Sequence, residues 1–124
     1  MHLIETVNVN PWPHCDLACV YCYGSFPEKP ARLSLAAWHV ILDEIARCRV
    51  RRVTFSGGEP TLHPDLAAML RHARELDLQT SIVTNGAKLT RAHIDLLDLV
   101  AVTLDALDED VLRRLGRTTN KSGP

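Results

Sequence analysis

Three cysteines lie within eight residues of one another, in the sequence Cys15-Asp-Leu-Ala-Cys19-Val-Tyr-Cys22. This CxxxCxxC spacing can bring three thiolates onto one soft metal centre, yet three protein ligands leave one coordination position open. An open position is typical of a centre that performs chemistry rather than one that only supports a fold. The spacing therefore predicts a reactive metal or iron–sulfur centre.

The composition fits one globular domain over residues 1–124, with 46% hydrophobic residues, 23% charged residues and a net charge of −1. Charges of both signs are interspersed, which argues against a nucleic-acid-binding surface or a polybasic membrane patch. No apolar run approaches the ~20 residues of a membrane span, and the N-terminus lacks the features of a signal peptide. We expect a cytoplasmic protein whose reduced, clustered cysteines bind metal.

Strand-like and helix-like segments alternate four times along the chain. Strands are expected at residues 3–9, 51–56, 78–84 and 99–104. Ser34, Thr90 and Asp108 stand where helix N-caps are expected, and the last two begin a short helix through Leu97 and a final helix. The cysteines fall in a long proline-rich loop at 10–33, and loops of this length are usually functional.

Each strand–helix–strand step predicts a right-handed parallel crossover. The segments 57–60, 84–86 and 103–105 follow three of the strands, so we expect them to gather with the cysteine loop on one rim, where ligands bind in parallel α/β folds. The four units use about 31 residues each, as in a complete (β/α) barrel. Four strands cannot close a barrel, so we expect a partial barrel, a fragment of a longer (β/α)6 core.

The rim motifs together resemble those of the radical S-adenosylmethionine (SAM) enzymes. Cys15, Cys19, Tyr21 and Cys22 match the CxxxCxΦC signature, in which Φ is aromatic; Gly-Gly-Glu-Pro follows the second strand and Thr-Asn-Gly the third. The resemblance implies a [4Fe–4S] cluster on the three cysteines, whose fourth iron is chelated by SAM. Reductive cleavage of SAM would give a 5′-deoxyadenosyl radical that abstracts a substrate hydrogen.

The same resemblance implies roles for the residues around the cluster. Tyr21 would pack near the adenine, and the segment Gly57, Gly58, Glu59 and Pro60 would hold the methionine ammonium group. Thr84, Asn85 and Thr103 would contact the methionine carboxylate and the ribose hydroxyls. An electron donor of the flavodoxin or ferredoxin type would reduce the cluster.

Within the superfamily, the chain is most similar to the viperin family of antiviral nucleotide dehydratases. The similarity rests on Val7-Asn8, on Phe-Ser before Gly57, and above all on the stretch 99–111 followed by Gly116-Arg117. It implies conversion of a nucleoside triphosphate, typically CTP, to its 3′-deoxy-3′,4′-didehydro analogue. The implied substrate contacts are Asn8, Arg52 and Lys121.

Two other functions remain open from the sequence. One is a radical SAM enzyme that modifies a peptide or builds a cofactor. The other is a zinc-binding module that uses His14 as a fourth ligand beside the three cysteines. Two further residues have structural expectations: Cys48, in a helical pattern, as a small buried side chain, and His63 as a helix cap or a surface residue.

Overall fold

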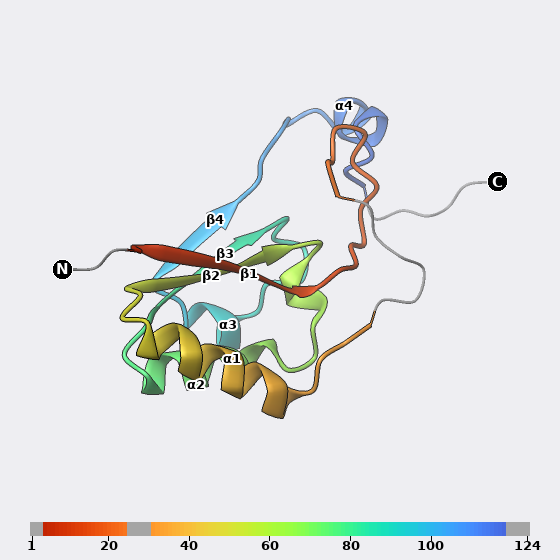
Figure 1. Cartoon of the computed structure of the whole chain (residues 1–124). Helices are drawn as coiled ribbons and strands as arrows, with labels where there is room; N and C mark the ends of the chain where they lie inside the picture. Colours follow the sequence, from red (N-terminus) through yellow and green to blue (C-terminus); the bar gives the residue numbers. More distant parts are fainter. Residues whose placement is uncertain (1–3, 25–30, 119–124) are drawn as a thin grey trace.

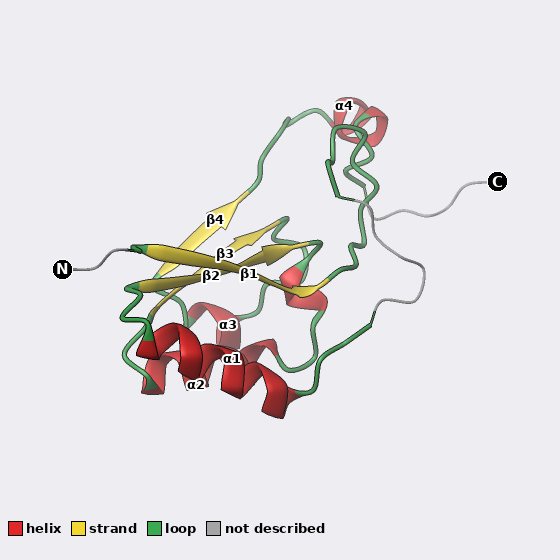
Figure 2. Cartoon of the chain, viewed as in Figure 1, coloured by secondary structure: helices red, strands yellow, loops and turns green. Residues whose placement is uncertain are grey.

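The computed structural model describes residues 4–24 and 31–118. Four parallel strands form one sheet in the order of the sequence: β1 (Thr6–Trp12), β2 (Arg52–Gly57), β3 (Gln79–Thr84) and β4 (Leu99–Val102). The connecting helices are α1 (Leu35–Arg47), α2 (Leu66–Glu75) and α3 (Arg91–Ile94), and α4 (Glu109–Arg114) follows β4 (Figure 2). The predicted βα alternation and partial barrel are thereby confirmed.

The three crossover helices α1, α2 and α3 lie on one face of the sheet (Figure 1). Because side chains alternate between the two faces of a strand, every second strand residue points into this layer. Val53, Phe55 and Ile82 come from the strands and meet Leu42 and Leu70 from the helices, all with no exposed surface. This apolar layer fixes the sheet, and the sheet in turn fixes the carboxyl ends of its strands.

The helices begin at the predicted caps. The Ser34 hydroxyl accepts a hydrogen bond from the Ala37 amide (3.2 Å), and the Asp108 carboxylate accepts one from Val111 (2.9 Å). Thr90 forms a reciprocal capping box with His93. Each cap satisfies an amide that the helix itself leaves without a partner.

The predicted strand at 3–9 ends too early. Strand β1 continues to Trp12, so the loop begins later than the predicted residue 10. Its register with β2 shifts between Val9 and Trp12. Pro11 is tolerated there because β1 is an edge strand of the sheet, where a missing amide hydrogen costs no ladder bond. Residue 3 lies outside the described residues.

Three smaller expectations are also corrected. Strand β4 ends at Val102 rather than 104, and α3 ends at Ile94 rather than Leu97. Cys48 is exposed, not buried, because it occupies the C-cap of α1, beyond the buried face marked by Trp38 and Leu42. In the described part of the chain, no helix is long and apolar enough to cross a membrane.

In the described chain, no helix covers the other face of the sheet (Figure 1). Asn8, Thr54 and Ser81 are aligned across three strands by the register. Hydrogen bonds cross the same face from Thr54 to Ser81 (2.5 Å) and from Ser56 to Asn10 (3.0 Å). The part of this face over β1 and β2 suits a polar ligand, whereas the side toward β4 also exposes the apolar Val83 and Leu99.

His63 is buried, with 2% of its surface exposed, so the prediction of a surface residue is wrong. Its Nδ1 accepts a hydrogen bond from the Asp65 amide (3.1 Å) just before α2, which is the capping role that the sequence suggested. The imidazole packs edge-to-face against Trp12, with 5.6 Å between the ring centroids. Burial lowers the pKa of His63, because the charged imidazolium loses its hydration.

Truncation of a core leucine should destabilise the fold far more than truncation of an exposed one. Leu70→Ala removes a side chain with no exposed surface and should reduce the free energy of unfolding by about 2–5 kcal/mol. Leu107→Ala is the matched control, because Leu107 is 90% exposed, and should change it by less than about 0.5 kcal/mol. Urea denaturation followed by circular dichroism measures both; equal losses would contradict the assigned core.

The lowered pKa of His63 predicts a loss of stability in acid. The unfolded chain takes up its proton near the ordinary pKa of about 6.5, before the folded chain does, so the free energy of unfolding should fall below that pH. The slope from this group is at most about 1.4 kcal/mol per pH unit. His63→Asn keeps an acceptor for the Asp65 amide but does not titrate. Between pH 7.5 and 5, the free energy of unfolding of the wild type should fall more steeply than that of the variant; equal slopes would exclude His63 as the source.

Candidate functional site

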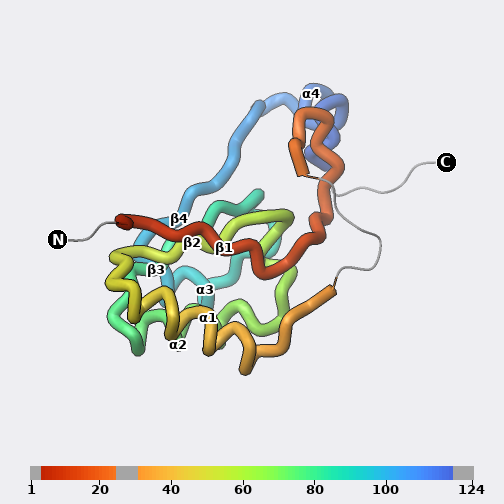
Figure 3. Tube along the Cα trace, in the orientation of Figure 1, coloured from red at the N-terminus to blue at the C-terminus, as the bar shows by residue number. Residues whose placement is uncertain are grey.

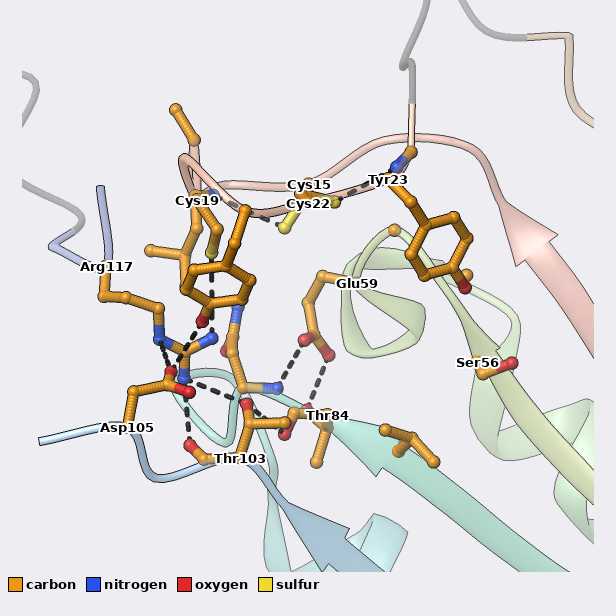
Figure 4. Close-up of a pocket in the computed structure, with 18 residues that line it drawn as sticks. Cys15, Cys19, Cys22, Tyr23, Ser56, Glu59, Thr84, Thr103, Asp105 and Arg117 are labelled. Atoms are coloured by element: carbon orange, nitrogen blue, oxygen red, sulfur yellow. Dashed lines mark hydrogen bonds and ion pairs between the residues drawn. The ribbon is translucent and has the colours of Figure 1, made fainter. Parts of the chain in front are cut away.

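The cysteine loop lies over the carboxyl ends of β2, β3 and β4 and encloses a cavity of about 530 Å³ (Figure 4). Nearly all the predicted cluster and cofactor residues line it: Cys15, Cys19, Tyr21, Cys22, Gly57, Gly58, Glu59, Thr84, Asn85 and Thr103. Pro60 is buried behind the cavity wall, at the start of the 3₁₀ turn η1 (Pro60–Leu62). Residues up to 88 positions apart in sequence thus surround one space.

The three cysteines are free thiols, and each sulfur accepts one N–H hydrogen bond. Cys15 Sγ accepts from the Leu17 amide (3.5 Å) and Cys22 Sγ from the Gly24 amide (3.4 Å). Cys19 Sγ accepts from Nη1 of Arg117 (3.8 Å). Burial raises the pKa of the Cys15 thiol, so a metal that binds there must displace its proton.

The arrangement of donors fits an iron–sulfur cluster better than a single ion. In residues 4–24 and 31–118, no three Cys, His, Asp or Glu side chains are placed to hold one metal ion. A cluster does not require this convergence, because each cysteine binds a different iron. His14 does not line the cavity, and its ring lies 6.3 Å from that of Trp12. The zinc alternative therefore does not match the folded loop.

The two glycines at the end of β2, Gly57 and Gly58, are required by the local backbone geometry. A Cβ atom on Gly58 would lie 2.0 Å from the carbonyl oxygen of His14, and Gly57 has φ = 111°, which side chains rarely adopt. The next amide, of Glu59, donates to the same His14 oxygen (2.7 Å). The turn thereby holds the chain directly before Cys15.

Glu59 is a buried carboxylate that joins the ends of two strands, with 1% of its surface exposed. Its Oε1 accepts from the Thr61 amide (3.0 Å), the Thr61 hydroxyl (2.6 Å) and the Thr84 hydroxyl (2.6 Å). Its Oε2 accepts from the Asn85 amide (2.8 Å). No Lys, Arg or His in the described residues forms an ion pair with it. Its charge is held by neutral donors and faces the cavity, which favours a cationic ligand group there.

Asn85 connects the end of β3 to the cysteine loop. Its Nδ2 donates to Oδ1 of Asp16 (2.8 Å), and its Oδ1 accepts from the Ala87 amide (2.9 Å). Because the backbone amide of Asn85 also donates to Glu59, three hydrogen bonds fix this residue. Asp16 was not singled out in the sequence, because nothing in its spacing distinguishes it from the other loop residues.

A second polar cluster lines the cavity beside Thr84, to whose carbonyl oxygen the Thr103 amide donates (3.1 Å). It is formed by Tyr21, Thr103, Asp105 and Arg117, and Figure 4 labels the last three. The Tyr21 hydroxyl donates to Oδ2 of Asp105 (2.7 Å), and this bond to a carboxylate raises the pKa of Tyr21 to about 12. The phenol therefore stays protonated at neutral pH. Nη2 of Arg117 donates to the carbonyl oxygen (2.9 Å) and hydroxyl (2.9 Å) of Thr103.

The sequence placed Asp105 on the rim, within the segment 103–105 after the fourth strand, and the cavity includes it. Sequence reasoning did not assign Arg117 to the site, because no local signal marks it. It reaches the cavity because the turn after α4 pairs with the cysteine loop: the amides of Ala18 and Val20 donate to the carbonyl oxygens of Gly116 (3.1 Å) and Leu115 (3.0 Å). Figure 3 shows the orange and blue segments side by side.

The predicted substrate residues lie outside this cavity. Asn8 lies on the polar face of the sheet, and Arg52 lies at the amino end of β2, where its Nη2 donates to Oε1 of Gln79 (3.2 Å). Lys121 is outside the described residues. Their proposed contacts with a substrate remain predictions.

Two curated proteins are similar to the chain over nearly all of its length. An "S-adenosylmethionine-dependent nucleotide dehydratase" of Flammeovirga pacifica is 28% identical over 134 residues, covering 99% of this chain and 46% of the relative. A "Probable GTP 3′,8-cyclase" of Methanopyrus kandleri is 37% identical over 121 residues, covering 93% of this chain and 39% of the relative. The chain thus spans less than half the length of these relatives.

Among solved structures, SuiB of Streptococcus suis has a similar fold. The structure of SuiB bound to the precursor peptide SuiA matches with a TM-score of 0.80 and 25% identity, over 93% of this chain and 27% of SuiB. The structure of SuiB bound to S-adenosylmethionine matches with a TM-score of 0.73 and 27% identity, over 92% of this chain and 26% of SuiB.

The family model of the radical SAM superfamily matches residues 9–122, which include the cysteine loop and every rim segment. The match agrees with the parallel βα units and with the three cysteines beside a single cavity. The family uses a [4Fe–4S] cluster together with SAM. The chain belongs to the radical SAM superfamily.

Proposed function

We propose that this protein is a nucleotide dehydratase of the viperin type. In this proposal, Cys15, Cys19 and Cys22 hold the [4Fe–4S] cluster, which when bound supplies the electron that cleaves SAM to a 5′-deoxyadenosyl radical. The observation that carries the proposal is the single cavity on which the three thiols and the rim motifs open. The protein's own part is to bind, orient and shield the reactants.

Glu59 is the residue that we expect to orient the methionine end of SAM. Its carboxylate is buried, lines the cavity and has only neutral donors as partners. An ammonium group of the ligand would supply the missing positive charge. Gly58, Asn85 and Thr103 line the same cavity, and we expect them to contact the remaining polar groups of the cofactor.

The polar face of the sheet supports a nucleotide as the substrate. Asn8, Asn10, Thr54 and Ser56 present amides and hydroxyls suited to sugar and base. Arg52 lies on the same face, five residues and about 16 Å along β2 from the rim, and in this proposal its guanidinium binds a phosphate group. The similarity to a nucleotide dehydratase favours the same class of substrate.

The second candidate is a radical SAM enzyme that modifies a peptide. The similarity to SuiB in its complex with a precursor peptide favours it. In this alternative, an extended peptide would add to an edge strand of the sheet, β1 or β4. The similarity to a GTP cyclase keeps cofactor biosynthesis as a third possibility.

Turnover should depend on a nucleotide. The protein, reconstituted anaerobically with iron and sulfide and reduced with dithionite, should release 5′-deoxyadenosine from SAM, and CTP should raise the rate about tenfold, or about 1.4 kcal/mol of the barrier. Cys19→Ser, which removes one cluster ligand, is the negative control. If CTP, UTP and GTP all leave the rate unchanged, the dehydratase proposal fails, although cleavage without substrate would still support the cluster chemistry.

A methyl group on Gly58 should impair formation of the metal site. Gly58→Ala places a Cβ 2.0 Å from the His14 oxygen, so the backbone next to Cys15 must shift by about an ångström to reach ordinary contact distance. The iron content after reconstitution should fall below half that of the wild type. Val40→Ala, on the exposed surface of α1, is the control. Full iron loading of Gly58→Ala would show that the close approach is not required.

A further inference from the structure

We propose that Arg117 is a positioning residue for the cluster: its guanidinium holds the Cys19 thiolate and raises the reduction potential of the [4Fe–4S] centre, while Asp105 offsets this effect as its counter-charge. The proposal rests on the cluster that the superfamily uses and not on the identity of the substrate.

The first observation is that the three cysteine sulfurs accept hydrogen bonds from different kinds of donor. Cys15 and Cys22 each accept a hydrogen bond from the backbone amide two residues later, Leu17 and Gly24. These donors are neutral backbone groups of the cysteine loop itself. Cys19 instead accepts from a cationic side chain, Nη1 of Arg117 at 3.8 Å, which lies 98 residues further along the chain. Of the three cluster ligands, Cys19 is therefore the one whose sulfur accepts a hydrogen bond from a positively charged side chain far away in sequence.

The second observation is that Arg117 is fixed before any ligand arrives. Its side chain is 10% exposed, and Nη2 is held by the carbonyl oxygen and hydroxyl of Thr103. Its backbone is fixed by Gly116, whose φ of 73° and close approach to the Ala18 oxygen exclude a Cβ atom. A partly buried, pre-ordered guanidinium loses little entropy on binding and is poorly screened by water, so its charge acts strongly on the neighbouring sulfur.

The third observation is the charge balance around the guanidinium. Oδ2 of Asp105 lies 2.7 Å from Nε of Arg117 and also accepts the Tyr21 hydroxyl (2.7 Å). Arg117 and Asp105 both line the cavity. Reduction adds one negative charge to the cluster, and hydrogen bonds to its sulfurs together with nearby positive charge stabilise that reduced form. Loss of the arginine should therefore disfavour reduction, and loss of the aspartate charge should favour it.

Opposite shifts of the reduction potential in the two variants would distinguish an electrostatic effect on the cluster from a purely structural role in holding the loop. If Arg117 and Asp105 only clamped the end of α4 to the cysteine loop, removal of either would loosen the loop in the same way. Both variants would then lose iron, with no opposite shifts in the potential of the cluster that remains.

The test is an EPR-monitored redox titration of the reconstituted full chain, without SAM and without substrate. Arg117→Gln should make reduction at least tenfold less favourable, which is about 59 mV more negative for a one-electron couple. Asp105→Asn should shift the midpoint in the positive direction, and Arg117→Lys should shift it less than Arg117→Gln because the charge remains. Arg113→Gln is the matched control: it removes the same charge from α4, where the side chain is 60% exposed and pairs with Asp110, and should leave the potential unchanged.

Equal or same-direction shifts for Arg117→Gln and Asp105→Asn would overturn the proposal. If Arg117→Gln takes up too little iron to titrate, Asp105→Asn decides alone, and an unchanged or more negative midpoint overturns it. The measurement needs no turnover, so failure of every nucleotide to stimulate SAM cleavage would reject the dehydratase function and leave this inference standing.

Discussion

The site depends on one buried carboxylate. Glu59 closes the end of β2, accepts the hydroxyl of Thr84 and the amide of Asn85 from the end of β3, and through its own amide holds His14 before the first cysteine. Four donors converge on its two oxygens. Removing such an acceptor would leave buried hydroxyl and amide groups without partners, which is more costly than the bonds themselves are stabilising. The carboxylate thus sets the ends of β2 and β3 relative to each other, and the backbone amide of the same residue holds the loop.

The parts of the fold that sequence predicted are those governed by local rules. Apolar periodicity located α1 and α2, and the side chains of Ser34, Thr90 and Asp108 marked helix starts because capping is decided within three residues. The strand ends fell on one rim because parallel crossovers leave no other arrangement. The errors lie where tertiary context decides: Pro11 reads as a loop residue until β1 is known to be an edge strand.

The candidate site likewise contains residues that the sequence predicts and residues that it does not. The cysteines and the glycines at 57–58 are visible in sequence because their chemistry requires a fixed residue type at a fixed spacing. Asp105 was expected on the rim from its place after the fourth strand, but Arg117 is not visible in sequence, since an arginine after a short helix is an ordinary residue on its own. Only the pairing of Ala18 and Val20 with the turn after α4 brings that arginine to Cys19. Long-range pairing of loops leaves no local pattern to find.

Two of the three cysteines, Cys15 and Cys19, are consequently anchored to different parts of the sheet. Cys15 follows His14, which the end of β2 holds, and precedes Asp16, which Asn85 holds at the end of β3. Cys19 is held from the other side by the segment after β4. The loop has little regular structure of its own, so its thiols acquire their spacing only when all four strands are in place. Cluster binding should therefore favour the folded state strongly, because the unfolded chain keeps the cysteines but not the anchors that arrange them.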